Sequence, residues 1–122
     1  ASHHKLDNLC AIIDYNKMQS DDLNENIIGL EPLADKWKSF GWHVLEIDGH
    51  NFNEIGKAFD EAKTKRDQPT VIIAHTIKGK GVSYMEGSPA WHGSLKLSDE
   101  DLTHALLELG ATEAEIERYI SE

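Results

Sequence analysis

A segment at residues 75–93 carries side chains that could bind an anion and move a proton. It contains Lys78, Gly79, Lys80 and Gly81 in a row, and His92 stands near its end. The lysines offer positive charge, and the glycines allow either a close approach of the backbone to a ligand or a turn through positive φ. His92 can exchange a proton near neutral pH. This composition beside a strand end predicts an anionic, phosphorylated ligand; a solvated turn is the alternative for the four residues taken alone.

Three apolar runs predict the strands that would position this segment. They are residues 9–14, 42–47 and 70–75, and helical patterns that begin near Pro32 and Asn51 separate them. The order strand, helix, strand, helix, strand predicts an α/β fold with a three-stranded parallel sheet and right-handed crossovers. Capping patterns at Ser98 and Thr112 predict two C-terminal helices that serve packing.

A second polar segment follows the first predicted strand. Asn16, Met18 and Gln19 come just past its carboxyl end, which is the edge where open α/β sheets bind ligands. From the local sequence alone, Asn16 is a turn residue that accepts a hydrogen bond from its own backbone. Residues 20–29, rich in Asn and Asp, are predicted to form a loop.

The apolar patterns also predict which side chains are buried. The continuous run at residues 9–14 is typical of a strand covered on both faces, so Cys10 is expected to be a buried core thiol. Two helical stripes are expected to face the sheet, and their members are Leu33, Trp37 and Phe40 in the first and Phe52, Ile55, Phe59 and Ala62 in the second.

Three short motifs in the segment at residues 75–93 stand in a specific order. They are TIKGKGV at residues 76–82, ME at residues 85–86 and WHG at residues 91–93. This string resembles the loop of transketolases, the thiamine-diphosphate enzymes that move two-carbon ketol units between sugar phosphates. The stretches around Asn16 and at residues 41–50 are also similar to transketolases. The resemblance implies no chemical role for His50, so a structural role is predicted for this residue.

The resemblance implies a role for each matching residue. The Asn16 side chain and the Met18 carbonyl would hold the magnesium that bridges the diphosphate, since Mg²⁺ prefers oxygen ligands. Lys78, Gly79, Gly81 and Gln19 would lie at the cofactor, with the glycines shaping the loop. His92 would be the catalytic residue, near the reacting carbonyl.

One motif of the family is missing from the sequence. A Gly-Asp-Gly segment should lie upstream and supply the second metal ligand, and neither Asp7 nor Asp14 has that context. Residues 1–122 therefore resemble only the later half of the diphosphate-binding domain. We expect remaining transketolase segments, or a subunit, to supply the missing Asp and the pyrimidine domain, and the complete enzyme to be an oligomer. The isolated chain is expected to be inactive, to bind thiamine diphosphate poorly and to expose the edge of its first strand.

Length and charge exclude other classes of protein. The 122 residues allow one small domain, and the excess of 22 acidic over 12 basic residues, a net charge of -10, argues against nucleic acid as a partner. No apolar stretch approaches the roughly 20 residues of a membrane span. A single cysteine supports no disulfide framework and fits a reducing cytoplasm.

Two alternatives remain open at this point. 1-Deoxyxylulose-5-phosphate synthase shares the cofactor and a similar Lys-Gly-Lys-Gly loop, although Met85-Glu86 and Trp91-His92-Gly93 favour transketolase. The other alternative is a non-catalytic protein. It would be an assembly subunit, or a remnant of the fold that binds a partner through the sheet edge and its apolar faces. A generic nucleotide-binding domain is disfavoured because no glycine fingerprint joins the first strand to a helix.

Overall fold

The computed structural model describes residues 1–20, 22–93 and 96–121. It consists of two units, residues 1–76 and residues 77–122, and each is described by itself. The first unit holds the sheet and the helices that pack on it. The second unit holds residues 77–93 of the glycine-rich segment at residues 75–93, and the two C-terminal helices.

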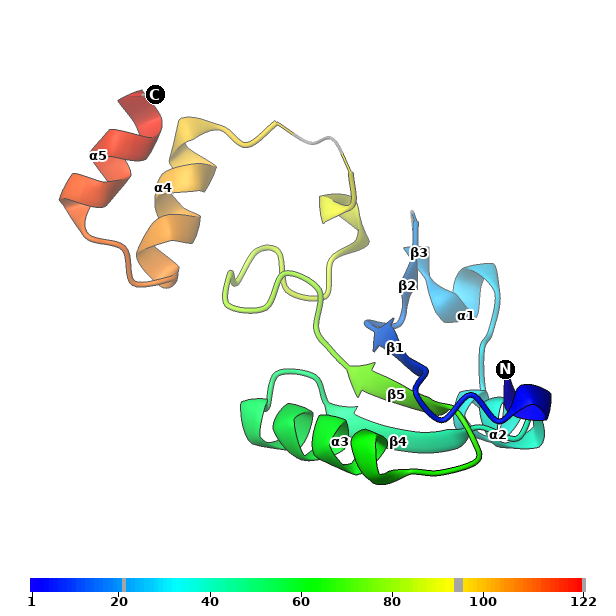
Figure 1. Ribbon diagram of the computed structural model, residues 1–122. Helices are drawn as coiled ribbons and strands as arrows, with labels where there is room; N and C mark the ends of the chain where they lie inside the picture. Colours follow the sequence, from blue (N-terminus) through cyan, green and yellow to red (C-terminus); the bar gives the residue numbers. More distant parts are fainter. Residues whose placement is uncertain (21, 94–95, 122) are drawn as a thin grey trace. The chain divides into compact units, whose positions relative to one another are not determined.

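A parallel three-stranded sheet forms the centre of the first unit. The strands are β1 (Cys10–Tyr15), β5 (Thr70–His75) and β4 (His43–Asp48), in the order β1-β5-β4 (Figure 1). This confirms the predicted sheet. The observed bounds of β5 match those of the third predicted strand. Strands β1 and β4 each begin and end one residue later than predicted. The reason is their pairing with β5, which aligns Tyr15 and Asp48 with His75 at the carboxyl edge.

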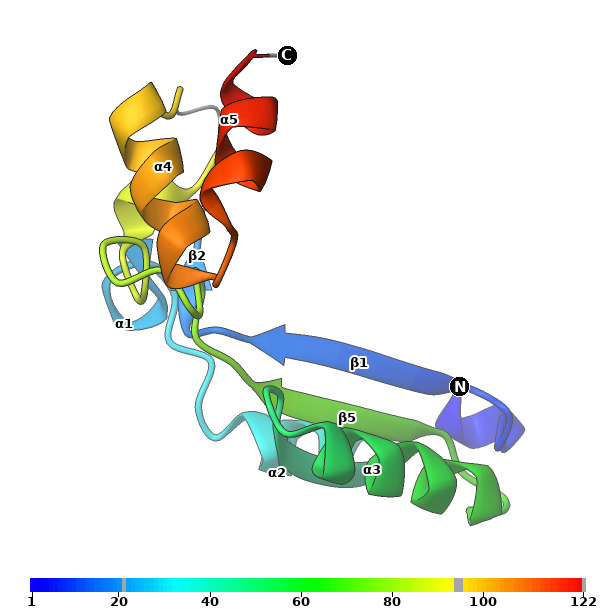
Figure 2. The ribbon, with the colours of Figure 1, turned by 90° about the vertical axis from the view of Figure 1, so that its left-hand side faces the viewer.

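The central strand β5 provides most of the core. Val71, Ile72 and Ile73 are almost completely buried, and α2 (Leu33–Ser39) and α3 (Phe52–Thr64) pack against β4. Strand β1, in contrast, lies at an edge, with β5 as its only neighbour in the described part of the chain (Figure 2).

The edge position of β1 makes one prediction wrong. Cys10 is exposed rather than buried, and Ile12 is 58% exposed, whereas Tyr15 is buried. Alternate side chains of a strand point to opposite faces, and the face of β1 that carries Cys10 and Ile12 is the more exposed one. The expectation of a strand covered on both faces therefore fails for β1. Strand β5, in contrast, is buried from Thr70 to Ala74.

Of the side chains in the predicted helical stripes, only Ala62 is buried. Leu33, Trp37 and Ile55 are half-buried, and Phe59 is 38% exposed. The face of α3 that is buried also includes Ala58, which the prediction did not name, whereas Phe52 is 89% exposed because α3 begins beyond the carboxyl end of β4. Phe40 is exposed because α2 ends before it. The helix predicted to begin near Asn51 is capped by that residue, since Asn51 Oδ1 accepts from the backbone N–H of Asn53 at 3.0 Å.

The segment at residues 20–29 is more ordered than the loop that its composition predicts. Strands β2 (Met18–Gln19) and β3 (Asp22–Leu23) form an antiparallel pair, and a short helix, α1 (Asn24–Ile27), follows. Local hydrogen bonds from its polar side chains stabilise this structure; for example, Asn26 Nδ2 donates to Asp22 Oδ2 at 3.0 Å. Asp21 of the predicted loop lies outside the described residues.

The second unit contains the two predicted C-terminal helices. Helix α4 (Asp99–Glu108) begins with a capping box between Ser98 and Asp101, and α5 (Glu113–Ser121) follows Thr112, whose hydroxyl pairs with Glu115. A 3-10 turn, η2 (Pro89–Trp91), precedes them, and another, η1 (Ser2–His4), opens the chain. None of the helices described is both long and apolar enough to cross a membrane.

Candidate functional site

The turn after β1 holds the two residues predicted to bind magnesium. Asn16 Oδ1 accepts a hydrogen bond from the backbone N–H of Met18 at 2.9 Å, and Lys17 between them has a positive φ of 64°. The turn interpretation of Asn16 is therefore confirmed. A carboxamide oxygen has a second lone pair, so this bond leaves Asn16 able to bind a cation as well.

Gln19 is engaged in holding this turn in place. Its Nε2 donates to the carbonyl of Ile28 at 2.8 Å, which ties the β2–β3 hairpin to the chain after α1. The predicted contact of Gln19 with a cofactor stays a prediction.

The glycines of the 75–93 segment are required by its backbone. Gly79 has a φ of 74° and Gly81 a φ of 99°, in the left-handed region that favours glycine. A Cβ on Gly79 would also lie 2.7 Å from the carbonyl oxygen of Met85. Of the two explanations that the sequence left open, a turn through positive φ is thus confirmed.

The structure distinguishes the two lysines of the segment. Lys78 Nζ lies 3.3 Å from Nδ1 of His92, so two of the predicted site residues meet within the second unit. Lys80 Nζ instead lies 3.3 Å from the Glu86 carboxylate, which also accepts from the Gly81 amide at 3.0 Å. The charge of Lys80 is therefore paired within the loop, whereas Lys78 faces the imidazole.

Residues of α4 hold this loop through side-chain and backbone contacts, and no sequence pattern identified them. Glu108 accepts from the amide and the hydroxyl of Ser83, both at 2.5 Å, and Tyr84 donates to the carbonyl of Asp101 at 2.7 Å. The Tyr84 ring also stacks on His104, with centroids 5.7 Å apart. The hydrogen bonds from Ser83 lower the pKa of Glu108. Burial, followed by the nearby Asp101 charge, raises the pKa of Tyr84.

Comparison with known proteins identifies the family of this chain. Residues 1–118 match the family model described as "Transketolase, thiamine diphosphate binding domain". The chain belongs to this transketolase family. The predicted resemblance is thereby confirmed, and with it the assignment to a thiamine-diphosphate-binding domain.

Transketolase relatives are similar over most of this chain. The 6-deoxy-6-sulfo-D-fructose transketolase subunit SqwG of Clostridium sp. (strain MSTE9) is 50% identical over 109 residues, which are 89% of this chain and 39% of that protein. One of the apulose-4-phosphate transketolase subunits of Phocaeicola vulgatus is 41% identical over 99 residues, 81% of this chain and 35% of that protein. This chain thus spans well under half the length of these relatives.

A solved structure confirms the fold. The transketolase of Campylobacter jejuni subsp. jejuni matches with a TM-score of 0.82 and 31% identity, over 98% of this chain and 20% of that chain. The three-stranded parallel sheet with its helices is thus a transketolase fold.

The side chains described fit the cofactors of transketolases in part. The Asn16 carboxamide and the Met18 carbonyl are oxygen donors of the kind that Mg²⁺ takes, and Lys78 and His92 are groups that suit a diphosphate. Over residues 1–20, 22–93 and 96–121 there is no group of three or more His, Cys, Asp or Glu side chains that could hold a metal ion. Asn16 belongs to the first unit and His92 to the second, and each unit is described by itself.

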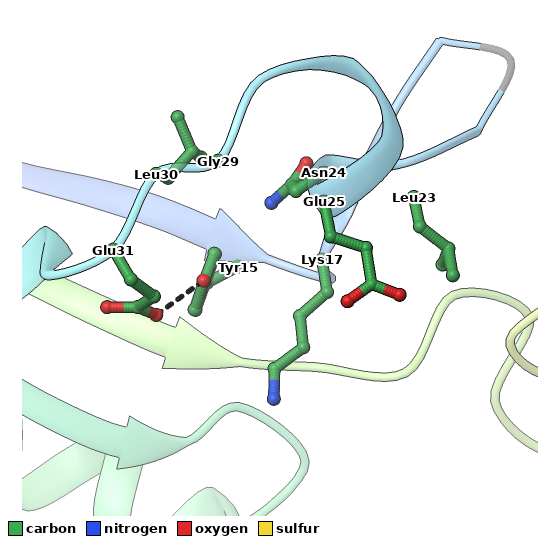
Figure 3. Close-up of a pocket in the computed structure, with 8 residues that line it drawn as sticks. All are labelled: Tyr15, Lys17, Leu23, Asn24, Glu25, Gly29, Leu30 and Glu31. Atoms are coloured by element: carbon green, nitrogen blue, oxygen red, sulfur yellow. Dashed lines mark hydrogen bonds between the residues drawn. The ribbon is translucent and has the colours of Figure 1, made fainter.

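A cavity next to the turn was not predicted. It has a volume of about 460 Å³ and lies beside the end of β1 (Figure 3), and its lining residues are Tyr15, Lys17, Leu23, Asn24, Glu25, Gly29, Leu30 and Glu31. Tyr15 donates to Glu31 at 2.5 Å. Asn24 is only 7% exposed, and its Oδ1 has no hydrogen-bond partner among the described residues.

The Tyr15–Glu31 hydrogen bond changes the acidity of both groups. It is the main cause that raises the pKa of Tyr15, with burial second, and the main cause that lowers the pKa of Glu31. No sequence signal marked this pair, because Glu31 stands between a predicted loop and a predicted helix.

Proposed function

We propose that this chain is part of a transketolase that transfers a two-carbon ketol unit from a ketose phosphate to an aldose phosphate with thiamine diphosphate and magnesium. The observation that supports this most directly is the pairing of Lys78 with His92, within a chain of this family, in the loop whose motifs matched. In this proposal residues 1–122 form the later part of the diphosphate-binding domain.

The residues of the chain would divide the work as follows. Asn16 and the Met18 carbonyl would hold the magnesium ion, Lys78 would add positive charge at the diphosphate, and Gln19 would lie near the cofactor. Bound thiamine diphosphate would supply the carbanion that attacks the ketose carbonyl. His92 would donate a hydrogen bond to oxygen atoms on which charge develops and would exchange protons there. Gly79 and Gly81 would keep the loop in the shape that allows this.

The substrate is proposed to be a sugar with an anionic end group. One relative is named for a sulfonated fructose and another for a sugar phosphate, and both names describe transketolase subunits. A phosphate or sulfonate group is compatible with the positive charge of Lys78. Both kinds of ketose are therefore the donors to assay.

The chain is proposed to work only in a larger assembly. Strand β1 has one strand neighbour in the described part of the structure, and Ile12 on it is 58% exposed, so this edge could receive further strands and helices. We infer that the remaining transketolase segments, or a partner subunit, complete the sheet and supply the second metal ligand and the pyrimidine domain. The lone Cys10 and the sugar-phosphate chemistry fit a cytoplasmic protein.

A pair of assays tests the proposal. The purified chain alone should show no ketol transfer and weak binding of thiamine diphosphate in calorimetry with Mg²⁺. The chain combined with the completing segments should transfer ketol units from a ketose phosphate or sulfonate to an aldose phosphate. Turnover by the chain alone would contradict the need for completion, and formation of 1-deoxyxylulose 5-phosphate by the assembly would favour the synthase alternative. An assembly that forms without any turnover would favour the non-catalytic role.

A further inference from the structure

The Lys78–His92 contact joins a cationic side chain to one of the two nitrogens of an imidazole ring. Lys78 Nζ lies 3.3 Å from His92 Nδ1. An ammonium group has three donors and no acceptor, so it can hydrogen-bond to a ring nitrogen only if that nitrogen has a free lone pair. A hydrogen bond donated by Lys78 therefore requires an unprotonated Nδ1, which puts the proton of the neutral ring on Nε2.

The backbone holds both partners of this contact in place. The amide of Gly87 donates to the carbonyl of Lys78 at 2.9 Å, and the amide of His92 donates to the carbonyl of Pro89 at 3.1 Å. His92 directly follows the turn η2, whose Trp91 ring packs edge-on against Tyr84 with centroids 5.1 Å apart. The two side chains thus extend from positions that are fixed within the second unit.

Lys80 cannot substitute for Lys78 in this role. Its ammonium group is paired with the Glu86 carboxylate at 3.3 Å, and that carboxylate also binds the Gly81 amide. The two lysines stand in the same Lys-Gly repeat, and only Lys78 reaches the imidazole in the structure.

We propose that Lys78 is a positioning residue that holds His92 in the Nε2–H tautomer, so that the imidazole offers a hydrogen-bond donor to its ligand. The ligand atom that meets Nε2 must then be an acceptor, such as a phosphate, sulfonate or carbonyl oxygen. The use of this donor in ketol transfer rests on the proposed function, whereas the tautomer itself does not.

Nuclear magnetic resonance of the chain labelled with ¹⁵N in its histidine rings tests the proposal directly. Spectra that correlate ring nitrogens with ring protons distinguish the two tautomers, and a His92→Gln variant identifies the His92 signals among the seven histidines. They are recorded well above the ordinary histidine pKa, where neutral rings dominate. In the unchanged chain, His92 Nδ1 should be the unprotonated nitrogen.

Removing the lysine should then change the tautomer ratio. In Lys78→Met the ratio of Nε2–H to Nδ1–H should fall roughly fivefold, the factor that corresponds to one net hydrogen bond of about 1 kcal/mol. Lys78→Arg, which keeps a cationic donor, should restore the ratio in part. Lys80→Met is the matched control and should leave the His92 signals unchanged. Signals of the other histidines report whether each variant folds.

The possible outcomes separate this inference from the proposed function. A protonated Nδ1 in the unchanged chain, or the same His92 tautomer ratio in Lys78→Met as in the unchanged chain, would overturn the inference. If the ratio shifts as expected but the completed assembly has no ketol transfer, the inference stands and the proposed function is wrong.

Discussion

Glu108 and Ser83 are joined by two hydrogen bonds, since the carboxylate accepts from both the amide and the hydroxyl of Ser83 at 2.5 Å. This pair ties the glycine-rich loop to the last turn of α4 in the second unit. The loop that carries Lys78 and His92 is thus held by a residue of a helix whose sequence pattern predicted only packing.

The Glu108–Ser83 pair should make the loop sensitive to acid. Its hydrogen bonds lower the pKa of Glu108, so the bond stabilises the loop fully above the ordinary glutamate range and is lost as pH falls through the lowered folded-state pKa. Hydrogen exchange at the Ser83 amide should therefore accelerate on acidification, after correction for intrinsic exchange. Glu108→Gln should show faster exchange already at neutral pH.

The control for this prediction is Glu117→Gln, which makes the same charge change on an exposed position of α5. Exchange at Ser83 should be unaffected by it. If Glu108→Gln and the control behave alike, the anchoring role of Glu108 is wrong.

A methyl group at Gly79 should destabilise the loop more than one at Gly87. Both glycines have positive φ, 74° and 66°, so alanine at either should cost about 1–2 kcal/mol in backbone strain. At Gly79 the new Cβ would also lie 2.7 Å from the Met85 carbonyl oxygen. A Cβ at Gly87 would have no neighbouring atom within 4 Å. Exchange protection over residues 77–93 should fall further in Gly79→Ala; equal losses would show that φ alone determines the effect.

Two isoleucines at the same level of the sheet should respond very differently to truncation. Ile12 of β1 pairs with Ile72 of β5, yet Ile72 is 2% exposed and Ile12 is 58% exposed. Ile72→Ala should lower the free energy of unfolding of the first unit by about 2–5 kcal/mol, through lost burial and a cavity. Ile12→Ala should cost much less in urea unfolding. A large loss for Ile12 would mean that copies of the chain cover β1 in solution.

The hydroxyl of Tyr15 should titrate later than that of a free tyrosine. Its hydrogen bond to Glu31, with burial second, raises its pKa. The contribution to stability is therefore present below the ordinary tyrosine pKa of about 10 and is lost as pH rises through the raised folded-state pKa. The ultraviolet difference titration between the unchanged chain and Tyr15→Phe should show ionisation above the ordinary value. Ionisation at the ordinary value would indicate that the bond to Glu31 does not persist in solution.

The local sequence alone determined several elements correctly because their signals are short-range. The apolar run at residues 70–75 is a strand with those bounds, and Asn51, Ser98 and Thr112 cap the helices that follow them. Each cap depends on hydrogen bonds between residues no more than three positions apart. The motifs around Lys78 and His92 likewise predicted the family that the comparisons confirmed.

Only the tertiary structure decided the features that depend on which elements become neighbours. The sheet order β1-β5-β4 leaves β1 at an edge, which exposes Cys10 and Ile12 although their sequence pattern matches that of a buried strand. Contacts between residues far apart in the sequence also bring Lys78, rather than Lys80, to His92 and join Glu108 to Ser83. These contacts depend on which distant segments the fold brings together, and local residue types and spacing do not specify that.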